Sequence, residues 1–493
     1  MKKKNIFKSE EMEFFKLVSQ VVTTNPFTDE RADLDLKITN LPISASRYEI
    51  IKAMINIVNE RIKGLESNGF FNLKDFDDEN KKIMEKVYLF QFFHNFIETF
   101  DELINNQIKE GDKPIKVTFA DEAISYLKNK GFYIDAARRF FALAYQIRRA
   151  FFFIDRSLMG KSNSMKFLRR NLWNNVFTYD LNLYDKHLWN RMEDFSTLIL
   201  GETGTGKGTS AAAIGRSGFI PFDEKKGIFT ESFAKNFISL NISQFPESLI
   251  ESELFGHKKG SFTGAIDDYK GIFDICSPYG SIFLDEIGEI SIPIQIKLLQ
   301  ILQERIFSPV GSHQKKRFQG RVIAATNKSI DELKKKKIFR DDFFYRLCSD
   351  IIIVPSLNER ISEDKEELND LIKFTVEKMI GVPSEELSEM IKQIIIEKLG
   401  INYSWPGNVR ELEQCIRRIF LKRNYEGNIS DISNDKDLES VLLEKIKNGS
   451  IDSQSLLSNY CALLYKRHGT YEEVATRTML DRRTVKKYIQ DIL

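Results

Sequence analysis

A glycine-rich segment carries the clearest chemistry in the chain. Residues 201–207 read Gly-Glu-Thr-Gly-Thr-Gly-Lys, the GxxxxGK pattern of a phosphate-binding loop. The glycines allow backbone N–H groups to surround phosphate oxygens, the following helix adds positive potential at its N-terminus, and Lys207 would reach the β- and γ-phosphates. The predicted ATP-binding set is Gly201, Glu202, Thr203, Gly204, Thr205, Gly206, Lys207, Gly208 and Thr209. Gly208 stands where the general motif has a Ser or Thr for Mg²⁺.

Two adjacent carboxylates form a second chemical feature. The apolar run that starts at Ser281 ends in Asp285 and Glu286. We expect Asp285 to hold Mg²⁺, directly or through water, and Glu286 to orient or polarise the attacking water. By itself, an apolar strand that ends in Asp-Glu is often only a solvated strand end. At this distance after a phosphate-binding loop, it predicts ATP hydrolysis.

Short apolar runs predict the strands that position these groups. They span Thr197–Leu200, Phe237–Leu240, Ser281–Leu284 and Arg321–Ala325, and helical stretches separate them. This alternation favours an α/β sheet of the doubly wound type. Upstream, the pattern is mostly helical, over Ser46–Leu65, Tyr88–Ile104 and Asp135–Phe153, and Ile115–Phe119 predicts a short strand. After Pro355 the pattern is helical again.

Length and composition set broad limits. The 493 residues suggest roughly three domains. The net charge of +2 indicates no bulk affinity for nucleic acid, so any basic surface must be local. Four widely spaced cysteines, Cys276, Cys348, Cys415 and Cys461, suggest neither a disulfide framework nor a zinc site. No signal sequence or membrane span is apparent, and we expect a cytoplasmic protein.

Several further motifs resemble one family closely. Residues 250–257 read Ile-Glu-Ser-Glu-Leu-Phe-Gly-His, and residues 260–265 read Gly-Ser-Phe-Thr-Gly-Ala. Together they are similar to the ESELFGH and GAFTGA signatures of the bacterial sigma-54-dependent activators, or enhancer-binding proteins. The likeness continues through the segments 285–289, 297–303, 324–327, 339–347 and 405–412, and covers about Met159 to Lys422.

In that family, the GAFTGA segment is a surface loop that contacts sigma-54 and moves with the nucleotide state. The resemblance implies the same role for the matching loop of this chain. The loop comprises Gly260, Ser261, Phe262, Thr263, Gly264 and Ala265. Its glycines permit a mobile tip, and Phe262 and Thr263 offer an apolar and a hydroxyl contact. Ser261 replaces the usual Ala, which leaves the strength of coupling open. Without the flanking motifs, an ordinary hairpin with a buried Phe would be the simpler interpretation.

The same resemblance implies further catalytic roles. Asn241 matches the asparagine that restrains the catalytic Glu, and Asn327 matches sensor I near the γ-phosphate. Arg410 matches sensor II in the helical lid, and the resemblance adds it to the predicted ATP-binding residues. Arg340 and Arg346 match the arginine fingers, which a neighbouring subunit supplies. The resemblance therefore implies an AAA+ ATPase that forms an oligomeric ring, expected to be a hexamer.

The C-terminal end predicts a DNA-binding unit. Helical patterns over Leu456–Tyr465, from Tyr471 and over Asp481–Ile489 resemble the Fis-type helix-turn-helix of the family. Val485 and Ile489 would face the core. Arg482, Arg483, Thr484, Lys486 and Lys487 would then contact enhancer DNA. A solvated basic helix is the plainer alternative.

The expected organisation has four parts. Residues 1–156 form a helical N-terminal regulatory domain, 157–355 the ATPase core, 356–425 the helical lid and 440–493 the DNA-binding domain. The N-terminal part shows no receiver, PAS or GAF signature. The simplest interpretation of its Phe-rich helices is that the phenylalanines form a hydrophobic core. A small-molecule signal and a protein partner both stay open.

The leading hypothesis is a transcription activator that uses ATP hydrolysis to remodel sigma-54 RNA polymerase. One rival is an AAA+ unfoldase or protease subunit, which predicts a substrate pore loop and no helix-turn-helix. Another is a repressor or sigma-70 regulator with a vestigial ATPase fold, which predicts loss of the loop at 260–265 or of the catalytic carboxylate. Both features are intact in this sequence.

Overall fold

The computed structural model describes residues 9–425 and 451–490, together with the single positions 427, 442, 446 and 449. The chain divides into two compact units. The first comprises residues 1–392 and 403–416, and the second residues 393–402 and 417–493. Most of residues 440–450 and all of 491–493, which belong to the predicted DNA-binding domain, lie outside the described residues.

A five-stranded parallel sheet organises the first unit. Its strands are β1 (Thr197–Leu200), β4 (Phe237–Asn241), β5 (Ser281–Asp285), β8 (Arg321–Thr326) and β9 (Asp350–Ile353), in the order β4-β5-β8-β1-β9. The α/β core predicted from the sequence is therefore present. Strand β9 was not predicted, although Ile351 to Val354 form an apolar run.

Alternate side chains of the sheet enter two separate apolar cores. Ile199, Phe283 and Ile323 pack on one face, whereas Leu198, Leu284 and Ala324 pack on the other. This period of two is the normal consequence of strand geometry, and burial of both faces explains why the strands are almost entirely apolar.

Short helices and hairpins surround the sheet. The helices are α10 (Lys207–Gly215), α11 (Glu247–Phe255), α12 (Ile272–Ile275), α13 (Ile292–Glu304), α14 (Ile330–Lys335) and α15 (Asp341–Leu347), with 3-10 turns at Ile242–Gln244 and Ile287–Glu289. Two hairpins pair β2 (Phe222–Asp223) with β3 (Ile228–Phe229) and β6 (Ile306–Phe307) with β7 (Lys316–Arg317). Helix α13 packs on α15, on the face opposite to α10.

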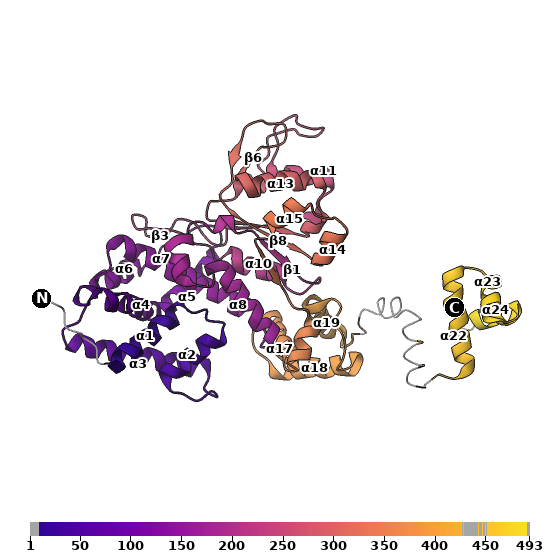
Figure 1. The fold of residues 1–493 in the computed structure, drawn as a ribbon, viewed down its shortest axis with the longest axis horizontal. Helices are drawn as coiled ribbons and strands as arrows, with labels where there is room; N and C mark the ends of the chain where they lie inside the picture. Colours follow the sequence, from indigo (N-terminus) through magenta and orange to yellow (C-terminus); the bar gives the residue numbers. More distant parts are fainter. Residues whose placement is uncertain are drawn as a thin grey trace. The chain divides into compact units, whose positions relative to one another are not determined.

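Helices α1 to α7 make up the N-terminal part of the described chain (Figure 1). They are α1 (Ser9–Thr23), α2 (Asp29–Thr39), α3 (Arg47–Ser67), α4 (Asp78–Asn95), α5 (Ile97–Glu110), α6 (Ala120–Asn129) and α7 (Ile134–Ser157), with a 3-10 turn at Leu73–Asp75. Their buried side chains belong to the same apolar core as Ile199, Ile214 and Ile323 of the sheet region. The N-terminal helices therefore share a core with the sheet.

Helix α7 makes the main contact with helix α10. Its Arg149 is fully buried, and the guanidinium donates to the carbonyl oxygens of Arg216 and Gly218 at 2.7 Å each. These carbonyls lie just beyond the end of α10, where the helix dipole favours a cation. Burial lowers the pKa of Arg149 to about 10. Gln146, one turn earlier, donates to the carbonyl of Ser217 at 2.9 Å.

The segment between α7 and the sheet contains α8 (Asn163–Phe177), α9 (Leu181–Leu183), a π-helical turn (Tyr184–Leu188) and a 3-10 turn (Met192–Asp194). Tyr184 is fully buried and hydrogen-bonds the side chain of Gln146 on α7. Trp189 packs against Phe219, with ring centroids 4.8 Å apart. The predicted strand at Ile115–Phe119 is wrong: Lys116 makes an isolated bridge to Ile228, and the next residues turn into α6.

Helices dominate the rest of the chain. They are α16 (Leu357–Glu363), α17 (Glu367–Ile380), α18 (Glu385–Leu399), α19 (Asn408–Lys422), α22 (Ser453–His468), α23 (Tyr471–Thr478) and α24 (Arg482–Gln490). The last three pack around Cys461, Leu464, Val474, Val485 and Ile489. Within the described parts of the chain, every helix is too short or too polar to cross a bilayer.

A substitution at Phe141 on α7 tests whether the N-terminal helices and the sheet share one hydrophobic core. Its ring is fully buried and lies 5.0 Å from Phe222 and 5.8 Å from Phe229, measured between centroids. We expect Phe141→Ala to lower the free energy of unfolding by about 3–5 kcal/mol, because the large cavity left behind adds to the lost transfer energy. Urea denaturation followed by circular dichroism measures the change. Phe167→Ala, at a 56% exposed position, is the control, and an equal effect of the two substitutions would contradict the shared core.

Candidate functional site

The glycine-rich loop joins β1 to α10 in the predicted manner. Its backbone enters the left-handed region at Gly204 (φ 83°) and Gly206 (φ 107°), which glycine adopts without strain. A Cβ atom on Gly204 would lie 2.3 Å from the carbonyl oxygen of Gly407, so glycine is also required there for close approach. The Thr205 hydroxyl donates to the carbonyl of Glu202 at 2.9 Å and fixes the turn.

Lys207 begins α10 and lies largely buried beneath the loop. Its ammonium group donates to the carbonyl oxygens of Gly201 (2.8 Å) and Glu202 (3.0 Å). Burial lowers its pKa, whereas the nearby Glu286 and Asp285 carboxylates act in the opposite direction. The side chain is thus a cation held at the start of a helix, among backbone N–H groups, which is the arrangement that binds phosphate.

The two predicted carboxylates lie at the carboxyl end of β5. Asp285 is opposite Asn241 in the β4–β5 pairing, so both side chains emerge at the same sheet edge. The Asp285 carboxylate accepts from the backbone N–H of Glu286 at 3.0 Å. Glu286 has φ 55°, a left-handed conformation that is uncommon for a residue with a Cβ atom. Backbone strain of this kind concentrates at functional sites.

Two predicted asparagines flank the carboxylates and the loop. The Asn241 carboxamide oxygen accepts from the N–H (3.0 Å) and hydroxyl (2.7 Å) of Ser243. No hydrogen bond joins Asn241 to Glu286 in the part of the chain that is described. Asn327 follows β8 and donates to the Thr203 hydroxyl at 3.5 Å. Both asparagines therefore lie beside the phosphate-binding loop.

A cavity of about 510 Å³ brings most of these groups together, but Asn327 is not among its lining residues. Thr203 to Thr209, Asn241, Asp285, Glu286 and Arg410 line its polar part. Leu158, Met159, Met165, Leu168 and Leu371 line another part of the wall, which is apolar. The cavity thus combines a phosphate-binding end with a surface that suits a flat, weakly polar ring.

A buried ion pair shapes the apolar part. Arg360 and Glu367 are 2.7 Å apart and almost fully buried. Arg360 donates to the Met159 carbonyl at 2.6 Å, and Glu367 accepts from the Lys161 N–H at 2.8 Å. A Cβ atom on Gly160 would lie 2.0 Å from the Glu367 carboxylate, so only glycine fits at this turn. Sequence reasoning missed this pair, because neither residue belongs to a recognised motif.

Asn408 is a second residue that sequence reasoning missed, although it lies inside the quoted segment 405–412. It is fully buried, and its amide group donates to the Glu202 carboxylate (3.0 Å) and the Thr203 carbonyl (3.1 Å). Its carbonyl oxygen accepts from the Leu357 N–H at 2.7 Å. Arg410 lines the cavity, and its backbone N–H donates to the Gly204 carbonyl at 3.4 Å. Helix α19 is thereby tied directly to the loop.

The predicted arginine fingers lie outside this cavity. Arg340 is exposed and forms an ion pair with Asp342 at 2.8 Å. Arg346 donates to the Leu302 carbonyl at 2.8 Å. Both belong to α15 or its N-cap. Within one chain, neither side chain is part of the nucleotide cavity.

The segment Gly260–Ala265 forms a closed surface loop. The Gly260 N–H donates to the Ala265 carbonyl at 2.8 Å, and Gly260 and Gly264 have left-handed φ values. Phe262 is 37% exposed and packs edge-on against His257, with centroids 4.9 Å apart. Thr263 is exposed, whereas the Ser261 hydroxyl is buried without a hydrogen-bond partner among the described residues. The loop thus presents a phenyl ring and a hydroxyl to solvent.

The predicted DNA-contacting residues lie on α24 or at its start. Asp481 accepts from the Arg483 N–H at 2.8 Å at the beginning of the helix. Arg482, Arg483, Lys486 and Lys487 are exposed, whereas Thr484 is half-buried. Val485 and Ile489 are buried on the opposite face. The helix is therefore amphipathic, with cations on its free side.

A parallel sheet, a glycine-rich loop that runs into a helix, and paired carboxylates on a neighbouring strand define a P-loop α/β protein. Residues 183–352 also match the family model described as the Sigma-54 interaction domain. This part of the chain therefore matches a sigma-54 interaction domain.

Curated relatives match over a similar region. The Nif-specific regulatory protein of Azotobacter vinelandii is 40% identical over 223 residues, 45% of this chain and 39% of that protein. The regulatory protein AtoC of Escherichia coli is 39% identical over 224 residues, 45% of this chain and 44% of that protein. The matched region thus spans less than half the length of these relatives.

Among solved structures, NtrX from Brucella abortus in complex with ADP gives a TM-score of 0.40 at 18% identity, covering 76% of this chain and 80% of that one. Its complex with ATP gives 0.39 at 19% identity, covering 75% of this chain and 80% of that one. We draw no conclusion from a similarity this low.

Asn408 allows a test of the link between the loop and α19. Asn408→Ala removes three hydrogen bonds and leaves the Leu357 N–H without its acceptor, and alanine also disfavours the φ of 54° at this position. We expect a loss of about 1–3 kcal/mol in the free energy of unfolding and weaker binding of a fluorescent ATP analogue. Ser404→Ala, at a nearby exposed position, is the control. Unchanged stability and affinity in Asn408→Ala would remove Asn408 from the site.

Proposed function

We propose that the protein is a sigma-54-dependent transcriptional regulator that couples ATP hydrolysis to remodelling of sigma-54 RNA polymerase. The observation that carries this proposal is the combination, in one sigma-54 interaction domain, of a P-loop and paired carboxylates around one cavity with the exposed loop Gly260–Ala265. A vestigial ATPase would have no selective reason to keep Lys207, Asp285 and Glu286 around one cavity.

The cavity fits ATP with Mg²⁺. Lys207 and the N–H groups at the start of α10 would bind the β- and γ-phosphates, and the apolar wall around Met159 would contact the adenine ring. Asp285 would hold Mg²⁺, directly or through water, and the ion would neutralise charge on the phosphates. Glu286 would polarise the attacking water, with Asn241 and Asn327 beside it.

The arginine fingers point to an oligomer. Arg340 and Arg346 lie outside the cavity of their own chain, so they would act on the nucleotide of a neighbouring subunit. Arg340 would then exchange its ion pair with Asp342 for the γ-phosphate. A closed ring, expected to be a hexamer, gives every site such a neighbour.

The C-terminal helices would bind enhancer DNA. Four exposed cations on α24 suit contacts with phosphates and base edges in a major groove. Arg482 forms an ion pair with Glu472 at 2.8 Å, which it would give up on binding. This DNA contact would hold the ring near the promoter, while the Gly260–Ala265 loop engages sigma-54.

Glu286→Gln tests the hydrolytic site. The change keeps the shape of the side chain but removes the carboxylate that would polarise water. We expect ATP turnover to fall by roughly 100-fold or more, with ATP binding largely retained, as is usual when a general base is lost. Phosphate release and binding of a fluorescent ATP analogue measure the two quantities. Glu289→Gln, at an exposed position three residues away, serves as the control; normal turnover in Glu286→Gln would reject the assignment.

Thr263→Ala tests the surface loop separately from catalysis. The Thr263 side chain is exposed, so its loss leaves the fold intact. We expect normal ATPase activity but no stable complex with sigma-54 in the presence of ADP and aluminium fluoride, a mimic of the γ-phosphate in transit. Native gel electrophoresis detects the complex. Thr230→Ala, at another exposed threonine, should behave like the wild type. Retention of the complex in Thr263→Ala would show that the hydroxyl makes no essential contact.

A further inference from the structure

A second cavity lies among the N-terminal helices, within the first unit of the chain. Its volume is about 230 Å³. Side chains of α1, α3, α4, α7 and α8 line it, and most of that lining is apolar, as with Phe90, Phe93, Phe151 and Trp173. An apolar cavity of roughly 150 Å³ holds a benzene molecule, so this one accommodates roughly nine non-hydrogen atoms by proportion.

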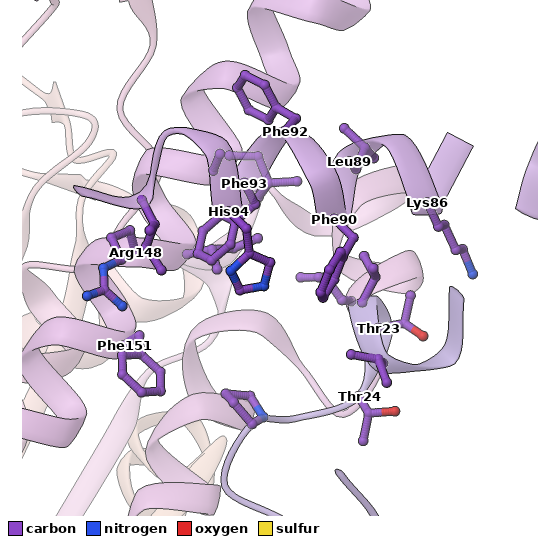
Figure 2. A pocket seen from close by; sticks show the side chains of 18 of the residues that line it. Thr23, Thr24, Lys86, Leu89, Phe90, Phe92, Phe93, His94, Arg148 and Phe151 are labelled. Atoms are coloured by element: carbon purple, nitrogen blue, oxygen red, sulfur yellow. The ribbon is translucent and has the colours of Figure 1, made fainter. Parts of the chain in front are cut away.

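His94 on α4 is the notable polar group of this cavity. Figure 2 shows its ring among the lining side chains, with Phe90 on one side and Arg148 on the other. The ring stacks near Phe90, with centroids 4.3 Å apart, and its Nδ1 atom is buried with no hydrogen-bond partner among the described residues. A buried polar atom without a hydrogen-bond partner is unfavourable, because it has lost its bond to water. A ligand atom at this point would remove that cost.

Burial, together with the neighbouring positive charges of Arg31 and Arg148, lowers the pKa of His94 to about 3. The imidazole is therefore neutral at physiological pH. In the tautomer with its proton on Nδ1, the ring would donate a hydrogen bond to a ligand acceptor in the cavity.

The charges around the cavity are unequal. Arg31, Arg47, Lys86 and Arg148 line it, whereas among the described lining residues Asp185 alone carries a carboxylate. Asp185 forms an ion pair with Arg139, outside the lining, at 2.7 Å. Cations therefore outnumber carboxylates in the lining itself, and Asp35 and Asp101 pair with two of these cations from outside it.

The three arginines differ in how well they are paired. Arg31 contacts Asp35 at 2.7 Å, and Arg148 contacts Asp101 at 2.5 Å. Arg47 reaches Asp155 only at 3.7 Å, and its guanidinium lies over the Phe151 ring, 4.9 Å from the centroid. The Arg47 side chain is 52% exposed, and the packing around it lowers its pKa. Arg47 is thus the least tightly paired of the three arginines, and an anionic ligand could bind it without displacing a close ion pair.

We propose that this cavity binds a small organic monoanion, with an apolar body of about one ring against the Phe side chains and a carboxylate that accepts from Arg47 and His94. The phenylalanine-rich lining excludes strongly polar metabolites, and the size excludes nucleotides. The site is independent of the nucleotide cavity, so its test does not depend on the proposed function.

Benzoate, benzamide and benzamidine form a matched set of probes, because they have nearly the same size but are anionic, neutral and cationic. Ligand-detected NMR and titration calorimetry on the full chain measure their binding. We expect benzoate to bind at least about 10-fold more tightly than benzamide, equivalent to about 1.4 kcal/mol, and benzamidine not to bind. Equal binding of all three, or no binding of benzoate, would overturn the proposal.

Two substitutions locate the site. Ala144 is a buried lining residue, and Ala144→Phe should fill the cavity and abolish benzoate binding. His94→Phe keeps a ring of similar size but removes the hydrogen-bond donor, and should weaken benzoate binding by about 10-fold. His187→Phe, at an exposed position outside the lining, is the matched control and should bind benzoate normally. If the Ala144→Phe variant does not fold, the His94→Phe variant is the remaining test. Unchanged benzoate affinity in the His94→Phe variant would reject the proposed site.

Discussion

The placement of helix α10 is the constraint on which the site depends. At its N-terminus, Lys207 and the glycine-rich loop form the phosphate-binding end, and Asn408 fixes the loop from α19. Just beyond its C-terminus, Arg149 and Gln146 of α7 bind the carbonyls of residues 216–218. Both ends of the helix therefore have polar partners from outside the sheet. The backbone groups of the loops that flank α10 are therefore the points at which its position is fixed.

The chemistry was largely predictable because it depends on local patterns. The glycine-rich loop, Lys207, Asp285 and Glu286 occupy one cavity, and the four predicted strands are correct to within a single residue at their ends. Strands buried on both faces give nearly continuous apolar runs, which are easy to recognise. Strand β9 was missed because its short run is followed at once by Pro355, which reads as the start of a different region.

The rest of the site depends on contacts between distant residues. Asn408 contacts Glu202, and Glu367 contacts Lys161, across more than 200 residues in each case. Nothing in the neighbourhood of either residue in the sequence indicates such a partner. The same holds for the second cavity: Phe90, Phe93 and Phe151 have the spacing of ordinary core residues, and only their three-dimensional arrangement leaves a space beside His94.

The shared core around α7 has a consequence for how such chains can be recombined. Phe141 and Phe153 on α7 contact Phe222, Phe229 and Phe233, which follow α10 in the sequence. Removal of the residues before Met159 would expose the rings of Phe222, Phe229 and Phe233 to water. The N-terminal helices therefore cannot be deleted without loss of part of the hydrophobic core. A chimera with a different N-terminal region would need a substitute for α7 with a matching apolar face and a buried cation near its middle. A boundary placed before α7, at about residue 131, would keep the aromatic contacts of α7 in place.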